Sequence, residues 1–212
     1  MGPDRDKLFL ELAGAPVVAH TWRRFDQAPV DEIILVVRDG LQDVFRTMAA
    51  DLSLSRPWRL VPGGRERQDS VWNGLEAVAA GTELVAIQDG ARPATPVDLI
   101  RRCLAAAHRT GASVAAQPAV DTVKESLDGS LISRHLDRAK LWNVQTPQCF
   151  RLEVIRRALG EVRARGLTVT DDTAACELIG QRVELVSSTA PNPKITSPGD
   201  LAPVEWLLKT AG

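Results

Sequence analysis

Residues 32–38 read Glu-Ile-Ile-Leu-Val-Val-Arg, an apolar run in which hydrophobic and polar side chains do not alternate. A strand that is covered on both faces has this pattern, because neither face meets water. Before and after this run, short stretches rich in β-branched residues alternate with longer segments of helical period. Such alternation is typical of a sheet of parallel strands with helices on both faces. The sequence therefore predicts an α/β fold with a mainly parallel sheet.

The other elements follow from the same two patterns. Strands are expected at 58–61, 84–88, 113–117, 141–144 and 182–186, and helices at 17–27, up to 50, 67–80, 96–109, 152–165, 171–179 and from 197 onward. Thr95 before Pro96 predicts a helix start with a capping hydroxyl. The segment at about 119–140 breaks the alternation and contains Asp128-Gly129, which is typical of a hairpin turn, so we expect a projecting β-arm there. Without an internal repeat or a low-complexity linker, residues 1–212 are expected to form one domain.

Composition excludes several classes of protein. The 212 residues are 44% hydrophobic and carry a formal net charge of -1, so no overall field favours nucleic acid or anionic lipid. The three cysteines lack paired spacing, which argues against a disulfide framework or a zinc site, and we expect them to be buried. No apolar run approaches the roughly 18 residues of a membrane helix. We expect a cytoplasmic protein with no nucleic-acid or membrane partner.

The first candidate site is the segment between a predicted strand and a predicted helix that reads Val61-Pro-Gly-Gly-Arg-Glu-Arg-Gln-Asp-Ser-Val71. Strand-to-helix junctions are where α/β folds bind ligands, and Gly63 and Gly64 allow a close approach of the backbone to a ligand. Asp69 and Ser70 offer polar groups for a base. The alternatives are a plain turn and a helix cap at Ser70.

The second candidate is Ile87-Gln-Asp-Gly-Ala-Arg-Pro93, at the carboxyl end of a predicted strand. Mg²⁺ prefers hard oxygen ligands and takes one or two carboxylates together with phosphate and water, which Asp89 could satisfy. Arg92 could bind a phosphate through two hydrogen bonds. The alternative is a surface ion pair that closes a turn.

A third set of polar residues lies in the C-terminal half, and each member has a structural alternative. Lys124 and Arg138 could be solvated residues of the arm, Thr170 could cap a helix, and Lys194 could lie on an edge strand. The set comprises Asp121-Thr-Val-Lys124, Asp137-Arg138, Thr146-Pro-Gln148, Thr168-Val-Thr-Asp-Asp172 and Asn192-Pro-Lys-Ile-Thr196.

Taken in order, these motifs resemble those of the 2-C-methyl-D-erythritol 4-phosphate cytidylyltransferase family, over almost the whole chain. The resemblance rests on Lys7-Leu-Phe-Leu, Gly14-Ala-Pro-Val-Val-Ala-His-Thr21, Gly63-Gly64, Arg67-Gln-Asp-Ser-Val71, Asp89-Gly-Ala-Arg-Pro93, Asp121-Thr-Val-Lys124, Thr146-Pro-Gln148 and Lys194-Ile-Thr196. It implies a Rossmann-like nucleotidyltransferase fold. It also implies a reaction that joins CTP to methylerythritol phosphate with release of pyrophosphate, in the non-mevalonate route to isoprenoid precursors.

The resemblance also implies a role for each matching residue. Catalytic roles fall to Lys7, Lys194 and the Mg²⁺-side acid Asp89. Nucleotide binding falls to Gly63, Gly64, Asp69, Ser70 and Gly90, and substrate binding to Arg92, Thr122, Arg138, Thr146 and Thr170. In this family the arm crosses to a second subunit, so a homodimer is implied in which Thr122 and Arg138 act in trans. Phosphoryl transfer fits such an inventory, since it requires positioning and cationic stabilisation and no covalent nucleophile.

The chain departs from the family at its beginning. The family starts with a buried strand and a glycine-rich triphosphate loop, of which only Met1 is matched here. We expect the missing strand to lie beside the one that ends at Asp89, and we interpret the departure as a start codon assigned too late.

Three other functions compete with this interpretation. A related cytidylyltransferase acting on another sugar-alcohol phosphate, such as ribitol 5-phosphate, would share the nucleotide motifs. A non-catalytic truncated paralogue would fit the missing loop. A dinucleotide-binding oxidoreductase would fit the α/β alternation, but the first strand is not followed by Gly-x-Gly-x-x-Gly.

Overall fold

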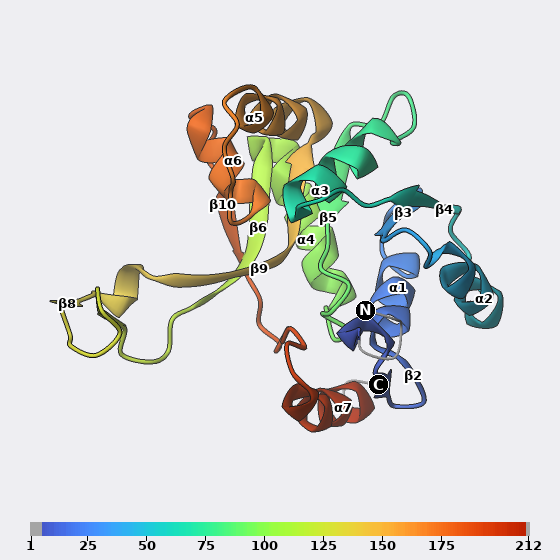
Figure 1. Cartoon of the computed structure of the whole chain (residues 1–212), viewed down its shortest axis with the longest axis horizontal. Helices are drawn as coiled ribbons and strands as arrows, with labels where there is room; N and C mark the ends of the chain where they lie inside the picture. The colour runs from blue at the N-terminus through green and yellow to red at the C-terminus, as the bar shows by residue number, and fades with distance from the viewer. Residues whose placement is uncertain (1–5, 211–212) are drawn as a thin grey trace.

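A four-stranded sheet forms the centre of the computed structural model, which describes residues 6–210 (Figure 1). Its strand order is β10-β6-β9-β5, with β5 at Leu84–Ile87, β6 at Ala112–Pro118, β9 at Trp142–Arg151 and β10 at Glu184–Ser187. β10 runs parallel to β6, whereas β9 is antiparallel to both of its neighbours. The α/β class is confirmed, and the sheet is mixed because the chain leaves β6, forms the arm and returns directly beside β6 as β9.

Helices cover both faces of this sheet (Figure 1). The helix α4, Val97–Thr110, packs on one face, and α5, Leu152–Ala164, with α6, Asp172–Leu178, packs on the other. Successive side chains of a strand point to opposite faces, so Cys149 enters the core beneath α4 while Phe150 enters the core beneath α5. Both are fully buried, so helices cover both faces of this part of β9.

A separate two-stranded parallel sheet carries the N-terminal part of the chain. It pairs β3, Ile33–Val37, with β4, Trp58–Pro62, and packs with α1, Val17–Asp26, and α2, Gln42–Leu52. Trp22 of α1 meets Trp58 edge to face, with ring centroids 5.3 Å apart. Among residues 6–210, β3 has a partner strand only on its β4 side and β5 only on its β9 side. Residues 1–5, to which we assigned the remnant of the triphosphate motif, lie outside the described part of the chain.

The expected arm is present between β6 and β9 and extends away from the sheet (Figure 1). Its strands are β7, Lys124–Glu125, and β8, Arg134–His135, which pair antiparallel. The turn is longer than Asp128-Gly129 predicts, since residues 126–133 separate the two strands. The Asp128 carboxylate accepts the backbone N–H groups of Leu131 and Ser130, and these bonds hold the pKa of Asp128 well below its ordinary value.

Two predicted boundaries are wrong for local reasons. The strand predicted at 141–144 continues to Arg151, although it contains Pro147, because its pairing with β6 is interrupted by a register shift at that point. A proline within a sheet is tolerated at such an irregularity. The helix α4 begins at Val97 with Pro96 as its N-cap, and the Thr95 hydroxyl bonds elsewhere.

Short elements complete the chain. Near the N-terminus are the 3₁₀ turn η2, Lys7–Phe9, and the strand pair β1, Glu11–Leu12, and β2, Ala15–Pro16. The remaining helices are α3, Arg67–Glu76, the 3₁₀ turns η3, Arg138–Lys140, and η4, Pro198–Asp200, and α7, Leu201–Thr210. Backbone N–H groups of Thr196 and Ser197 bond Asp200 and lower the pKa of this carboxyl to about 2.

Burial agrees with the analysis of the cysteines. All three are unpaired and buried, as predicted, and burial raises the pKa of Cys176 to about 12. Within residues 6–210, none of the helices combines the length and the apolar character that crossing a membrane requires.

Candidate functional site

Asp89 lies at the centre of a group of cations, directly after β5. The Lys194 Nζ is 2.8 Å from Asp89 Oδ2, and the Arg92 Nε is 3.8 Å from the same oxygen. The Arg67 Nε lies 4.0 Å from Oδ1. The Asp89 side chain is only 18% exposed, so these charges meet in a partly desolvated place where their interaction is stronger than in water. The structure thus brings together three segments that are far apart in the sequence.

The backbone of Asn192, a buried residue, fixes the Arg92 side chain. Its Nη1 donates to the Asn192 carbonyl at 2.6 Å, and its Nε is buried without a hydrogen-bond partner among the described residues. Burial lowers the pKa of Arg92, although the charge of Asp89 opposes this shift. Because Arg92 is 8% exposed, the alternative of a surface ion pair does not hold.

Two hydroxyl groups fix the backbone of the segment that carries Asp89. The Asp89 N–H donates to Thr146 Oγ1 at 3.1 Å, and Thr21 Oγ1 donates to the Gly90 carbonyl at 2.8 Å. Thr146 is 3% exposed. Its hydroxyl therefore supports Asp89 from within the sheet, and a contact with substrate stays a prediction.

The glycine-rich segment forms a tight loop between β4 and α3. The Gly63 N–H donates to the Val37 carbonyl at 2.7 Å, and the Gly64 N–H donates to Ser70 Oγ at 3.0 Å. A Cβ placed on Gly64 would lie 2.3 Å from the Cβ of Asp69, so only glycine fits there. The helix cap is Glu66 and not Ser70, since the Glu66 N–H donates to Asp69 Oδ2 at 3.1 Å. The alternative of a Ser70 cap is thereby wrong.

Lys7 follows Asp6 at the start of η2, beside the Asp89 segment. A Cβ placed on Gly90 would lie 3.3 Å from the Leu8 side chain, so η2 and Gly90 are close neighbours. Asp6 accepts the Leu8 N–H and pairs with Arg38, which anchors the turn to the end of β3. The backbone of Lys7 is thus fixed next to Gly90.

The remaining predicted residues lie farther from Asp89 or face solvent. Thr170 does not cap α6, because Asp171 accepts the Ala174 N–H at 2.9 Å instead. Thr122 and Arg138 are exposed on the arm, which extends away from the sheet (Figure 1). A single subunit does not bring these two residues to Asp89.

Two functional candidates, Asp172 and Asn192, received no role in the sequence analysis. Asp172 is 0% exposed, and its Oδ2 lies 2.7 Å from Arg67 Nη2. Burial raises the pKa of Asp172, although the Arg67 hydrogen bond opposes this shift. Burial would lower the pKa of Arg67, but the hydrogen bond to Asp172 and the nearby carboxylates outweigh it, and the pKa of Arg67 is raised. Both candidates were in quoted motifs, but only the fold shows them to be buried.

The donor chemistry fits a single Mg²⁺ held by Asp89. Its carboxylate offers hard oxygens, and Mg²⁺ completes its shell with phosphate and water. Residues 6–210 hold no group of three or more His, Cys, Asp or Glu side chains arranged for a metal ion. A Mg²⁺ ion at Asp89 would need its other oxygen ligands from phosphate and water.

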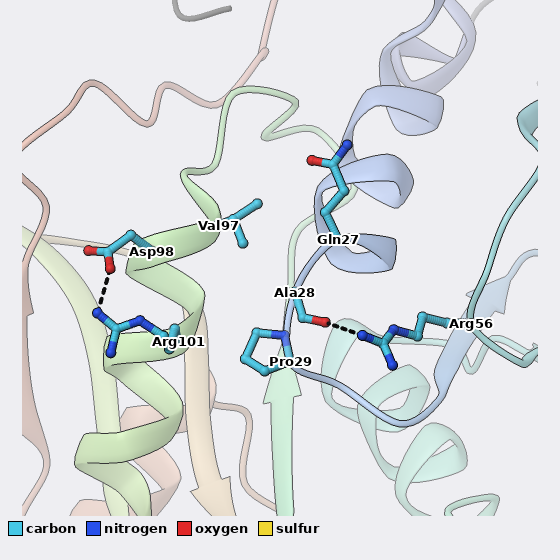
Figure 2. A pocket seen from close by; sticks show the side chains of 7 residues that line it. All are labelled: Gln27, Ala28, Pro29, Arg56, Val97, Asp98 and Arg101. Atoms are coloured by element: carbon cyan, nitrogen blue, oxygen red, sulfur yellow. Dashed lines mark hydrogen bonds and ion pairs between the residues drawn. The ribbon is translucent and has the colours of Figure 1, made fainter.

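A hollow of about 450 Å³ between α1 and α4 contains none of the predicted site residues (Figure 2). Three of its polar side chains already bond within the protein. Asp98 accepts from Arg101 at 2.6 Å, and Arg56 donates to the Ala28 carbonyl at 3.4 Å. The other lining residues are Gln27, Pro29 and Val97. The candidate site is therefore the cluster of charges around Asp89 and not this hollow.

Comparisons with known proteins agree on one family. The family model described as "IspD: 2-C-methyl-D-erythritol 4-phosphate cytidylyltransferase" matches residues 1–210. A protein named 2-C-methyl-D-erythritol 4-phosphate cytidylyltransferase from Pelotomaculum thermopropionicum is 40% identical over 211 residues, which cover 99% of this chain and 89% of the relative.

Solved structures give the same result. The crystal structure of 4-diphosphocytidyl-2C-methyl-D-erythritolsynthase from Anaerococcus prevotii superposes with a TM-score of 0.88 at 29% identity, covering 95% of this chain and 93% of that one. The 2-C-methyl-D-erythritol 4-phosphate cytidylyltransferase of Thermus thermophilus gives a TM-score of 0.81 at 32% identity, with 96% of this chain and 93% of that one covered.

Proposed function

Because the chain belongs to the 2-C-methyl-D-erythritol 4-phosphate cytidylyltransferase family, we propose that it transfers the cytidylyl group of CTP to 2-C-methyl-D-erythritol 4-phosphate. A phosphate oxygen of the acceptor forms a bond to the α-phosphorus of CTP, and the bond from that phosphorus to the bridging oxygen breaks to release pyrophosphate. The observation that supports this most is the convergence of Arg92, Lys194 and Arg67 on Asp89 beside the glycine loop.

The nucleotide is proposed to bind over the glycine loop. Gly63 and Gly64 admit the flat base, and Ser70 and Asp69 border the same loop. Gly90 lies at the junction between nucleotide and acceptor. Since Gly64 has no room for a side chain, the loop presents its backbone directly to the base.

The cations are proposed to stabilise the charge of the transferring group. Lys7 and Lys194 face the phosphates, and Arg92 binds the acceptor phosphate, while Thr146 and Thr170 line the acceptor side. Cationic groups that are already fixed before the reaction stabilise a crowded, negatively charged transition state without reorganisation. Arg92 is well fixed in this sense, because its Nη1 is bonded to the Asn192 carbonyl.

Asp89 is the residue proposed to hold Mg²⁺. When bound, the ion neutralises phosphate charge and polarises the phosphoryl oxygens. The protein's own contribution is to fix the carboxylate, through the bond from the Asp89 N–H to Thr146 and the contact with Lys194.

The arm is proposed to form a homodimer and to complete the acceptor site of the partner subunit with Thr122 and Arg138. Four large apolar side chains of the arm are between 68% and 86% exposed in the single chain: Val120, Leu127, Leu131 and Ile132. Apolar groups gathered on one projecting segment are typical of a surface that packs against another protein. We further propose the cytoplasm as the compartment, since the three cysteines are unpaired.

Pyrophosphate release from CTP, acceptor and Mg²⁺ tests this function. The assay compares 2-C-methyl-D-erythritol 4-phosphate with ribitol 5-phosphate as the acceptor for the folded 212-residue chain. Asp89→Asn and Lys194→Ala should each abolish most of the activity while the protein stays folded. Activity with ribitol 5-phosphate alone would support the related transferase, and no activity of the folded protein with either acceptor would support the non-catalytic paralogue.

A further inference from the structure

An ion pair next to Asp89 has no assigned role in the chemistry above. Arg67 is the first residue of α3 and Asp172 is the first residue of α6, and their side chains meet with 2.7 Å between Nη2 and Oδ2. The pair therefore joins the end of the nucleotide loop to the acceptor-side segment that contains Thr170. No other side-chain ion pair connects these two helix starts among residues 6–210.

The Asp172 carboxylate is fully buried but only partly hydrogen-bonded among residues 6–210. It is 0% exposed, and its second oxygen, Oδ1, is buried without a hydrogen-bond partner in the described part of the chain. Its N–H donates to Gln148 Oε1 at 3.1 Å, and Gln148 Nε2 donates to Asp171 Oδ2 at 3.0 Å, so the backbone that carries the carboxylate is fixed. A buried charge with an unsatisfied oxygen is unfavourable for folding, and a selected function explains its retention better than stability does.

Arg67 spans two carboxylates. While its Nη2 contacts Asp172, its Nε lies 4.0 Å from Asp89 Oδ1. A guanidinium has donors on several sides of a rigid plane and can address both acids at once, whereas an ammonium is a single point of charge. Lys194 approaches Asp89 at its other oxygen, so Arg67 and Lys194 each contact a different oxygen of the carboxylate.

We propose that Arg67 and Asp172 are positioning residues for cytidylyl transfer. Asp172 orients the Arg67 guanidinium, and Arg67 holds Asp89 and the start of α3 in a fixed position relative to the acceptor side. The proposal rests on the proposed function, since it assigns the pair to that site. Without the pair, Asp89 is freer to rotate and the start of α3 loses its charged link to the start of α6, while Gln68 still bonds Leu167 and Val169.

The test compares Asp172→Asn, Arg67→Gln, Arg67→Lys and the double variant Arg67→Gln/Asp172→Asn. Turnover and the KM for CTP are measured at fixed Mg²⁺, together with thermal unfolding and calorimetric binding of MgCTP. Arg109→Gln is the matched control, because it removes an ion pair of similar length, 2.9 Å to Glu184, that joins α4 to β10.

Each single variant should lower kcat at least about tenfold, because a small misplacement of a positioned group is costly in the transition state. The double variant should be no worse than the poorer single variant, since both break one unit. Arg67→Lys should recover thermal stability without recovering kcat, and Arg109→Gln should stay within about twofold of the parent in kcat.

The outcomes separate this proposal from the proposed function. A parent protein that binds MgCTP and turns over, with Arg67→Gln and Asp172→Asn equally active, would overturn the positioning role alone. Additive losses in the double variant, or full recovery of kcat in Arg67→Lys, would also overturn it. A folded parent protein that neither binds MgCTP nor releases pyrophosphate would instead overturn the proposed function.

Discussion

Replacing Asn192 by alanine should destabilise the buried hydrogen-bond network that supports Arg92. Asn192 is 1% exposed, and its Nδ2 donates to the Thr146 carbonyl at 2.8 Å and to Gln145 Oε1 at 3.1 Å. Its Oδ1 accepts from Thr95 Oγ1 at 2.9 Å. The Thr95 hydroxyl has a second acceptor in the Arg92 carbonyl at 3.0 Å, so this third bond is the least costly to lose.

The magnitude follows from these three bonds. A buried hydrogen bond contributes about 1 kcal/mol net, and a buried partner left unsatisfied costs about 1 to 3 kcal/mol. Asn192→Ala should therefore lower the free energy of unfolding by about 2 to 3 kcal/mol. For a chain of this size such a loss corresponds to a decrease in Tm of roughly 4 to 12 °C.

Thermal and urea unfolding measure this change against a matched control, Asn73→Ala. Asn73 is half-buried and makes one side-chain bond, to the Pro62 carbonyl at 3.1 Å, so its loss should be about 1 kcal/mol or less. Because the Asn192 side chain fixes the backbone whose carbonyl accepts from Arg92, the KM for the acceptor should rise in Asn192→Ala and stay unchanged in Asn73→Ala. Equal Tm values for the two variants would refute this estimate of what the Asn192 hydrogen bonds contribute to stability.

Three further predictions concern the loop, the C-terminal helix and the arm. Gly64→Ala should weaken MgCTP binding by at least about tenfold in calorimetry, because its Cβ would overlap Asp69, and normal binding would show that the loop moves freely. The depressed pKa of Asp200 adds stability above its ordinary value of 3.8, and this stability disappears as the pH falls toward about 2. Asp200→Asn should thus be less stable than the parent protein at pH 7, and its stability should not show this decrease between pH 3.8 and about 2. The same dependence of stability on pH in both proteins would contradict this. Leu127→Asp with Ile132→Asp should yield monomers in sedimentation and reduce turnover, and an active dimer would exclude the arm as the interface.

The sequence predicted the fold best where local and tertiary signals agree. The run at 32–38 became β3 within one residue at each end, because apolar and β-branched side chains favour a strand, although only Val37 of its five residues is fully buried. The run that became β9 was predicted short, since Pro147 is a poor strand former and only the shift in pairing with β6 makes room for it. The return of β9 between β5 and β6 is a property of the pairing and has no signature in the strand itself.

The site was predicted where a residue's type already implies its chemistry. An acid after a strand and a glycine pair before a helix are visible in the sequence, and the structure puts Asp89 and Gly64 in those places. The residue type and sequence position of Asp172 and Asn192 do not by themselves imply a role at the site. Their importance lies in being fully buried while making polar contacts across about a hundred residues of chain, which depends on the finished packing.

This difference suggests how stability and function are connected at Asp89. The residues that surround Asp89 with positive charge are partly exposed, as the 39% exposure of the Lys194 and Arg67 side chains shows. Those that hold them, Thr146, Asn192 and Asp172, are nearly inaccessible and polar. Apolar residues of equal volume could replace such buried polar groups with little loss of stability or even a gain. A buried polar support beneath partly exposed cations is therefore better explained by the need for a fixed Asp89 than by the need for a stable fold.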